Sequence, residues 1–384
     1  MRKSAPPILI LCAVAGLAHE TLTTTVLFDR EIVRILDKHC VMCHVENGPS
    51  FPLATYEQTW LKKREIRAAV IARHMPPWAA VPGYGQFAND NSLTLRETQF
   101  VVSWVEGLGP RNAGTVFTNI AGPDAARPRD IAAQPDFGHW ELGDPQLKRE
   151  LPPRTIEPQA NNEIKRTAID LGLTSERRLR GLEYMPGDRR VVRAAFFTIQ
   201  ETGQWIGSWT PWYGFANLPK GATWRLPAGS HIIAEIYYRG TKEQVIESGT
   251  LGLFFADQAS PTSVSDLVLE AKGEVPPAAE AHKFRAATRL PADTYALALR
   301  PEILPGVKSV EVSARNLDGG TEVLLFAKDF QMDWPTPYVF KEPVVLPRGA
   351  ELSVTAYYSN AGAAAQAGGI RLTVSEYQKA VPRK

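Results

Sequence analysis

The sequence predicts a multidomain α + β chain, in which a small all-α domain is followed by two antiparallel β-sandwiches. Three observations lead to this prediction. The chain has 384 residues, more than one ordinary core accommodates. Helical spacing of apolar residues is confined to 24–112, and many short strands follow from 161 onward. The 30 prolines and 29 glycines suit a mostly β chain with many turns.

The composition indicates a soluble globular protein. Apolar residues make up 44% of the chain and charged residues 22%. Lys and Arg number 43 against 41 Asp and Glu, a formal net charge of +2. Such a balance gives no overall basic field, so we expect no nucleic-acid partner.

The first 18 residues have the features of a secretory signal peptide. Arg2 and Lys3 precede a short apolar run over 8–17, and small residues stand before a predicted cleavage after Ala18. The run is shorter than the roughly 20 residues needed to span a bilayer. We therefore expect a periplasmic or secreted protein that does not span the membrane once the signal is removed.

Residues 24–112 carry the signals of three helices. The segments are VLFDREIVRILDKHC, TYEQTWLKKREIRAAVIARHM and TLRETQFVVSWVEGLGP. Pro76 and Pro77 end the second helix, and Thr94 with Glu97 predicts a capping box at the start of the third. These three helices predict a small α domain.

The rest of the chain is predicted as a Pro-rich linker over 113–160 and two sandwiches over 161–258 and 259–384. Segments such as VVRAAFFTIQ, HIIAEIYYRG and TLGLFFAD predict strands of the first sandwich. The second is predicted from TYALALRP, KSVEVSARN, TEVLLFAKDF, AELSVTAYYS and GIRLTVSEYQ.

The first helix ends in the motif Cys40-Val41-Met42-Cys43-His44. In a c-type haem site, two thiols bond the vinyl groups and the adjoining histidine binds the iron, and this spacing brings all three to one side of a helical turn. A zinc site would need a second pair of ligands, and a redox disulfide would expect a βαβ surrounding. The motif therefore favours one covalent haem c on Cys40 and Cys43 with His44 as proximal ligand, and zinc or a disulfide are the alternatives.

The second axial ligand should approach the iron from the opposite face. Met75 is the leading candidate, because it ends the second helix and precedes Pro76, which turns the chain away from helical geometry. A methionine opposite a histidine suits electron transfer. His74 is the alternative distal ligand.

The segments ILDKHCVMCH, FPLATYEQTW, IRAAVIARHMPPW and FVVSWVEGLGP resemble the cytochrome c domain of secreted bacterial proteins related to copper type II, ascorbate-dependent monooxygenases. Those proteins are similar to peptidylglycine α-hydroxylating monooxygenase. The resemblance implies a bond from the His44 ring to a carbonyl near Pro49. Over 163–380 it implies two jelly-roll-like sandwiches, each with one copper in the active relatives.

The copper ligands of that family are absent from the matching positions. This chain has Arg193 and Ala194 where the family has a His-His pair, and Tyr237 where the family has another histidine. The two histidines of the family's His-x-His motif fall on Glu302 and Leu304 of this chain, and the family's methionine ligand falls on Tyr377. The resemblance therefore implies that copper is not bound.

These inferences together predict an exported monohaem cytochrome c that carries single electrons between redox partner proteins, with the β region as a docking part. An active haem- and copper-dependent monooxygenase with unrecognised ligands, and a haem redox sensor or binding module, are the alternatives. Whether the chain is an enzyme stays open at this stage, and no catalytic residue is assigned.

Overall fold

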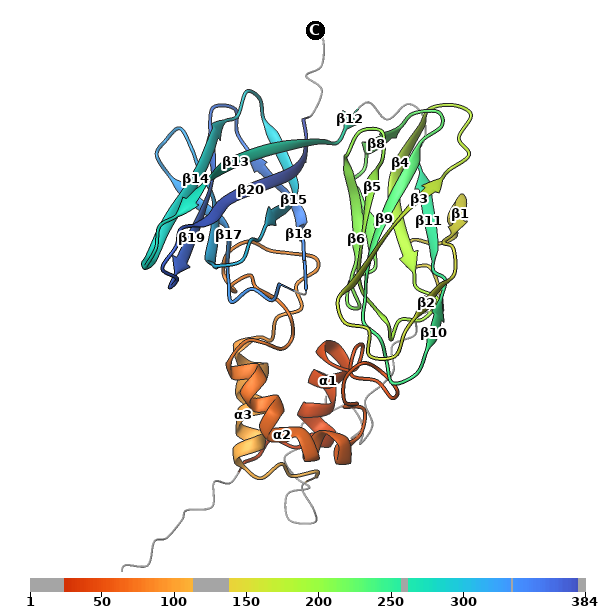
Figure 1. Cartoon of the computed structure of the whole chain (residues 1–384), viewed down its shortest axis with the longest axis vertical. Helices are drawn as coiled ribbons and strands as arrows, with labels where there is room; N and C mark the ends of the chain where they lie inside the picture. The colour runs from red at the N-terminus through yellow and green to blue at the C-terminus, as the bar shows by residue number, and fades with distance from the viewer. Residues whose placement is uncertain (1–23, 113–137, 257–261, 333, 379–384) are drawn as a thin grey trace, which may run out of the picture.

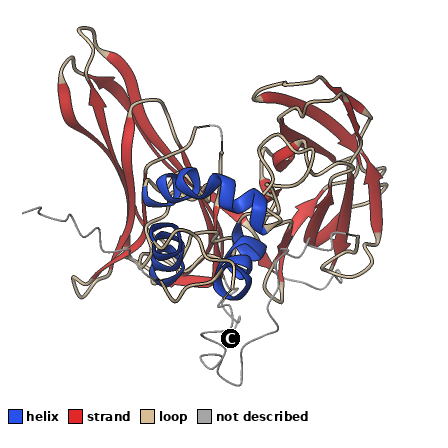
Figure 2. Cartoon of the chain, turned by 90° about the horizontal axis from the view of Figure 1, so that it is seen from below, coloured by secondary structure: helices blue, strands red, loops and turns tan. Residues whose placement is uncertain are grey.

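The computed structural model describes residues 24–112, 138–256, 262–332 and 334–378. These residues form mostly antiparallel β-sheets with few helices, so the prediction of a β-rich chain is confirmed. Figure 1 shows two β-sandwiches side by side, with the helices below them, and Figure 2 shows from below that the helices lie in front of the space between the two sandwiches. The predicted signal peptide over 1–18 lies outside the described residues.

The helical part has its own small core. Phe28 and Trp104 are fully buried there, and the edge of the Phe28 ring packs against Tyr56 with 5.3 Å between the ring centroids. This apolar contact helps to hold the helices together. The elements are a π-helical turn η1 (Phe28–Ile32), α1 (Val33–His39), α2 (Tyr56–Ile71) and α3 (Leu95–Glu106).

Capping boxes fix the start of both longer helices. Thr94 accepts a hydrogen bond from the backbone of Glu97, whose side chain bonds back to the backbone of Thr94, as predicted. Thr55 and Gln58 form a second box at the start of α2. Each box satisfies two backbone N–H groups that a helix otherwise leaves without a partner.

The first sandwich packs a sheet of order β1-β11-β4-β8-β12, with β7 beside β4, against a sheet of order β3-β9-β5-β6. Strands β1 and β2 come from 147–156, within the segment predicted as a linker, and pair with β11 and β10. The bounds are β1 (Leu147–Glu150), β2 (Arg154–Ile156), β3 (Glu163–Asp170), β4 (Arg177–Met185), β5 (Val192–Ile199), β6 (Trp205–Trp209), β7 (Phe215–Asn217), β8 (Ala222–Leu226), β9 (His231–Tyr238), β10 (Val245–Glu247), β11 (Thr250–Phe255) and β12 (Thr262–Ser263).

The second sandwich consists of two four-stranded sheets, β13-β20-β15-β18 and β14-β19-β16-β17. All pairings within these two sheets are antiparallel. The bounds are β13 (Ser265–Val275), β14 (Ala279–Arg289), β15 (Thr294–Glu302), β16 (Val307–Arg315), β17 (Thr321–Lys328), β18 (Tyr338–Leu346), β19 (Glu351–Asn360) and β20 (Gln366–Tyr377).

A segment between α2 and α3 is built into the second sandwich. We call residues 78–89 the inserted segment. Its Trp78 and Phe87 belong to the core of that sandwich and are 8% and 3% exposed. Backbone bridges join Ala80 to Ala327 and Phe87 to Phe340. The helical part is therefore not independent of the sheets, because its own chain supplies aromatic residues to their core.

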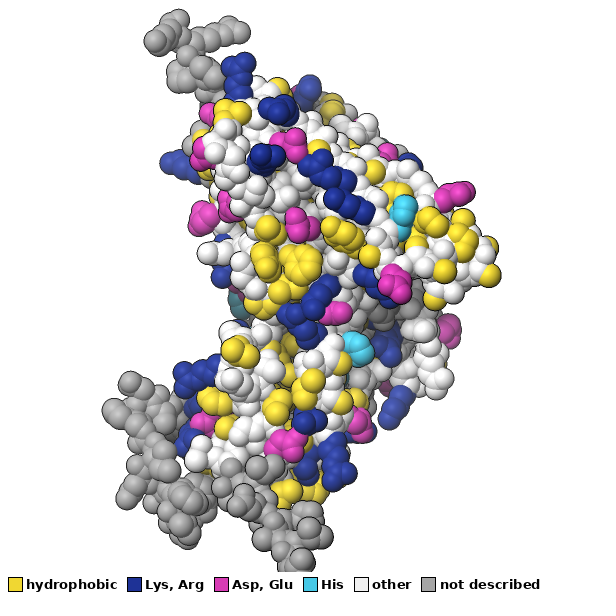
Figure 3. All heavy atoms as spheres, turned by 90° about the vertical axis from the view of Figure 1, so that its left-hand side faces the viewer, with side chains coloured by type: hydrophobic (Ala, Val, Ile, Leu, Met, Phe, Trp, Pro, Cys, Tyr) yellow, Lys and Arg dark blue, Asp and Glu magenta, His cyan; other side chains and the backbone are white. Residues whose placement is uncertain are grey.

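Charges of both signs are spread over the surface. On the face in Figure 3, Lys and Arg side chains lie interspersed with Asp and Glu, so neither sign dominates it. This mixture agrees with the small net charge of the sequence. In the part of the chain that the structure describes, no helix combines the length and the apolar character needed to cross a membrane.

Candidate functional site

The cysteine motif forms a tight turn directly after α1. The backbone N–H groups of Cys43 and His44 donate to the carbonyl of Cys40 at 3.1 and 2.9 Å. This turn brings both thiols and the imidazole to the wall of a single pocket. Both cysteines are free thiols and half-buried.

A backbone carbonyl orients the His44 ring. Nδ1 lies 2.9 Å from the carbonyl oxygen of Phe51, which only accepts hydrogen bonds, so the proton belongs on Nδ1. Nε2 is then left with its lone pair, the form in which histidine binds a metal. The resemblance implied a hydrogen bond to a carbonyl near Pro49, and the carbonyl that accepts it here belongs to Phe51, two residues further along the chain. Burial lowers the pKa of His44, against the opposing effect of this hydrogen bond, and so favours the neutral ring.

The pocket lies where the helical part meets both sandwiches. It has mostly apolar walls and about 1270 Å³ of empty space, including the solvent at its mouth. One wall carries the cysteine turn and α1, another carries Ile66 and Val70 of α2, and a third comes from the sheets. A pocket with apolar walls and a few converging polar groups is typical of a site for a cofactor or a small molecule.

The thiols are held in their protonated form. Burial raises the pKa of Cys40 to about 12, and the neighbouring Cys43 adds to the shift. Burial also raises the pKa of Cys43 to about 12, although Arg189 and Arg193 oppose the change. Because the thiolate is the form that exchanges disulfides, these pKa values disfavour disulfide exchange at neutral pH.

The structure separates the two candidates for the distal position. Met75 lines the same pocket as His44, with 37% of its surface exposed. His74 is exposed and does not line the pocket, and its carbonyl accepts a hydrogen bond from the Gln331 side chain. The geometry therefore favours Met75 over His74 as the group that faces a ligand in this pocket.

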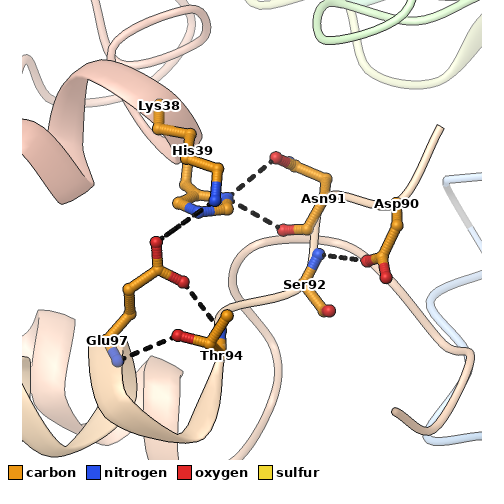
Figure 4. A network of polar contacts seen from close by, with 7 residues as sticks. All are labelled: Lys38, His39, Asp90, Asn91, Ser92, Thr94 and Glu97. Carbon is orange, nitrogen blue, oxygen red and sulfur yellow. Dashed lines mark hydrogen bonds and ion pairs between the residues drawn. The ribbon is translucent and has the colours of Figure 1, made fainter. Parts of the chain in front are cut away.

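His39, next to the first cysteine, is fixed by its own polar network (Figure 4). Its Nδ1 lies 3.2 Å from both the carbonyl and the side-chain oxygen of Asn91, and its Nε2 lies 3.3 Å from a carboxylate oxygen of Glu97. His39 is 5% exposed. The network joins the cysteine turn to the start of α3, where Glu97 also closes the capping box with Thr94.

This network predicts a pH-dependent contribution to stability. Burial alone would raise the pKa of Glu97, but hydrogen bonds from Thr94, the charge of His39 and a bond from Lys38 lower it to about 2, from 4.5. The folded state thus favours the ionised carboxylate. The contribution of Glu97 to the free energy of unfolding is therefore complete above pH 4.5 and falls as the pH drops toward 2. We expect Glu97→Gln to lower the free energy of unfolding by about 1–2 kcal/mol at pH 7 in urea titrations.

The difference in the free energy of unfolding between wild type and Glu97→Gln should shrink as the pH falls from 4.5 to 3, because the Glu97 carboxylate of the wild type becomes protonated in the unfolded state. Glu106→Gln is the matched control on the same helix. Glu106 forms an ion pair with Arg67, and both side chains are about 40% exposed. Losing this exposed pair should therefore lower the free energy of unfolding by less than about 1 kcal/mol. A difference for Glu97→Gln that stays constant down to pH 3 would contradict the assigned pKa shift.

The third wall of the pocket contains arginines that the sequence pattern does not place in the site. Arg189, Arg190, Arg193 and Arg239 come from the first sandwich, and Trp334 comes from the second. In the sequence, Arg193 stands out only as a position where a family ligand is missing. No local sequence signal links these residues to the cysteine turn, because the tertiary fold alone brings them there.

The other positions compared with copper ligands lie in three separate places. Ala194 is buried in β5, and the Tyr237 hydroxyl in β9 donates to Glu235. Glu302 at the end of β15 accepts from Arg371, and Tyr377 at the end of β20 stacks on Tyr295. Leu304 is exposed. In the described ranges, no group of three or more His, Cys, Asp or Glu side chains could hold a metal ion.

Comparisons with known proteins do not place the chain in a family. No family model matches it, and no curated protein matches it. Among solved structures, the major capsid protein of bacteriophage PM2 shares 8% identity at a TM-score of 0.26, covering 62% of this chain and 99% of that one. A peptide-N(4)-(N-acetyl-β-D-glucosaminyl) asparagine amidase shares 13% identity at 0.28, covering 61% and 98%.

A triple jelly-roll protein of an archaeal virus shares 8% identity at a TM-score of 0.21, and the match covers 58% of each chain. These matched structures are two viral proteins and an amidase.

These findings correct the resemblance drawn from the sequence. Membership in a family of cytochrome c domains fused to copper monooxygenase-like sandwiches is wrong, because neither a family model nor a curated protein matches the chain. The function that followed from it, an electron-carrying cytochrome with a docking region or a copper oxidoreductase, is overturned with it. The pocket and its donor set do not depend on that resemblance, because their positions follow from the fold of this chain.

Proposed function

We propose that this protein binds one haem covalently in the pocket between the helices and the sandwiches. The observation that supports the proposal is the shared position of four side chains. Cys40, Cys43 and His44 form one wall of a mostly apolar pocket, and Met75, which follows α2 after its end at Ile71, lines the same pocket. Two thiols, a histidine and a methionine around an apolar slot are the donor set of a c-type haem site.

Each of these residues fits a definite role. The Cys40 and Cys43 thiols would each add across a vinyl group, so that a C–S bond forms and the thiol hydrogen goes to the neighbouring carbon. His44 would bind the iron through Nε2, because its Nδ1 is engaged with Phe51. Met75 would be the second protein ligand of the iron, with His74 as the alternative ligand. Bound haem would supply an iron ligated by the protein from two sides.

The alternatives raised by the motif fit the pocket less well. A zinc clip needs further ligands, and no group of His, Cys, Asp or Glu suited to a metal is found in the described part of the chain. A redox disulfide needs an accessible thiolate, whereas burial raises the pKa of both thiols to about 12. Haem attachment is also compatible with the proposed export to the periplasm or beyond, where c-type haem proteins mature.

The proposal is tested by producing the chain with its signal peptide in a host that attaches c-type haem. We expect haem to remain with the polypeptide after denaturation and acid–acetone extraction, and the pyridine haemochrome spectrum to show saturated vinyl positions. The Cys40→Ala, Cys43→Ala double variant should release all of its haem under the same treatment.

Cys12 provides the control for attachment. It lies in the predicted signal segment, so Cys12→Ala should leave haem attachment unchanged. Wild-type protein that carries no haem after production in the maturing host, or haem that resists extraction from the double variant, would overturn the proposal.

A further inference from the structure

The charged groups around the pocket are distributed unequally. Its cationic side chains, apart from histidine, are four arginines, and all four come from the loop before β5, from β5 itself or from the end of β9: Arg189, Arg190, Arg193 and Arg239. The carboxylate on its lining is Glu65 of α2. The wall formed by the first sandwich is therefore positive and faces the helical wall that carries the cysteines.

Arg190 is already neutralised within its own sandwich. Its guanidinium bonds to Asp188 at 2.6 Å and to Glu243 at 3.1 Å. Its charge is therefore balanced without a ligand, so it is a weak candidate for binding one.

Arg193 and Arg189 each lie against an aromatic ring at the pocket wall. Arg193 is only 3% exposed, bonds to the side-chain oxygen of Asn162 and lies 4.5 Å from the ring centre of Trp334. Arg189 lies 4.9 Å from the ring centre of Trp209 and donates to the carbonyl of Pro211 at 2.9 Å.

Burial also acts on the charge of Arg189. It lowers the pKa of Arg189 to about 10. Both arginines also act on the thiol of Cys43 through their charge. Two preoriented cations therefore border the space next to the cysteine turn, in surroundings where an anion is strongly favoured.

We infer that Arg189 and Arg193 bind the carboxylate groups of the haem, an inference that rests on the proposed function. The two propionates are the anionic substituents at the rim of a haem, and a guanidinium matches a carboxylate with paired N–H donors. The cofactor would then be bonded to the helical part through the cysteines and to the first sandwich through the arginines. Haem loading would thereby fix the position of these two parts relative to each other.

The test uses haem-loaded full-length protein and the resonance Raman bands of propionate bending, which respond to hydrogen bonding of the carboxylates. We expect Arg189→Gln and Arg193→Gln each to shift a propionate band, and Arg193→Lys to shift it less. Arg180→Gln is the matched control. Arg180 belongs to the same sandwich and lies 5.4 Å from the ring centre of Phe254, but does not line the pocket, and its replacement should leave the bands unchanged.

Hydrogen exchange supplies an independent readout. Amides of 187–193 should exchange about tenfold more slowly in haem-loaded wild type than in the haem-free Cys40→Ala, Cys43→Ala variant, because charged hydrogen bonds hold the loop. This protection should be lost in Arg189→Gln. Haem that stays covalently attached in the arginine variants with unshifted bands and unchanged protection would overturn the inference and leave the proposed function intact. Wild-type protein without haem would overturn both.

Discussion

Replacing Trp78 with alanine is expected to lower the free energy of unfolding by about 3–5 kcal/mol. Trp78 is 8% exposed in the core of the second sandwich. The edge of its ring packs against Phe87 and Tyr338, with centroids 5.9 and 5.3 Å apart. The alanine variant loses these contacts and leaves a cavity that the surrounding strands fill only in part. Urea unfolding followed by tryptophan fluorescence and far-UV circular dichroism measures the loss.

Trp60→Ala is the matched control, since it removes the same side chain from a helix surface. Trp60 is 40% exposed and lies under the Lys63 ammonium, so its loss should cost about 1 kcal/mol or less. Equal costs for the two variants would show that the inserted segment does not contribute to the core of the second sandwich.

The same replacement should disturb the pocket, because Trp78 follows the Met75-Pro76-Pro77 turn directly. Asn89 at the other end of the inserted segment is 2% exposed and bonds to Pro337, Val339 and the indole of Trp212. These bonds tie the segment to both sandwiches. We therefore expect Trp78→Ala to weaken the proposed ligation of haem iron by Met75 as well as the fold.

Met75→Ala is expected to abolish the long-wavelength absorption band that a ferric iron shows when a thioether is its axial ligand. If haem is bound as proposed, thioether bonds to Cys40 and Cys43 should keep it attached in this variant, so that only the ligation of the iron would change. Met75 lines the pocket that contains His44, so it would be the second protein ligand of the proposed haem. Absorption spectra of the ferric and ferrous protein measure the change.

His74→Ala is the control one residue away. His74 is exposed and does not line the pocket, so its replacement should leave the band unchanged. A band that disappears in His74→Ala and persists in Met75→Ala would reverse the assignment of the distal ligand.

The elements that follow strong local patterns were predictable. Phe28, Ile32, Ile35 and Leu36 recur at helical spacing and are buried together in the helical core. Strands such as β5, β9 and β19 combine β-branched residues with alternation, and each forms where expected. The capping box of α3 was predicted because Thr94 and Glu97 meet in the same turn.

Strands β13 and β14 were not predicted, since their sequences carry many charged residues and few β-branched ones. β14 reads AEAHKFRAATR, with a single buried residue, Phe284. Both lie at the edges of their sheets, where one side faces solvent and polar residues are tolerated. Pairing with β20 and β19 holds them in place, and this is a property of the sheet that the strand sequence alone does not reveal.

The sequence by itself determined the chemistry of one wall: two thiols and a histidine within five consecutive residues, which a single turn necessarily brings together. It also suggested Met75, because a proline after a helix redirects the chain. Only the tertiary structure decided that the opposite wall is the first sandwich, with Arg189 and Arg193 at its surface, and that the second sandwich anchors the segment after Met75. Those contacts join residues more than a hundred positions apart. They form because they bury apolar surface, and no local sequence pattern reveals which distant segments will pack together.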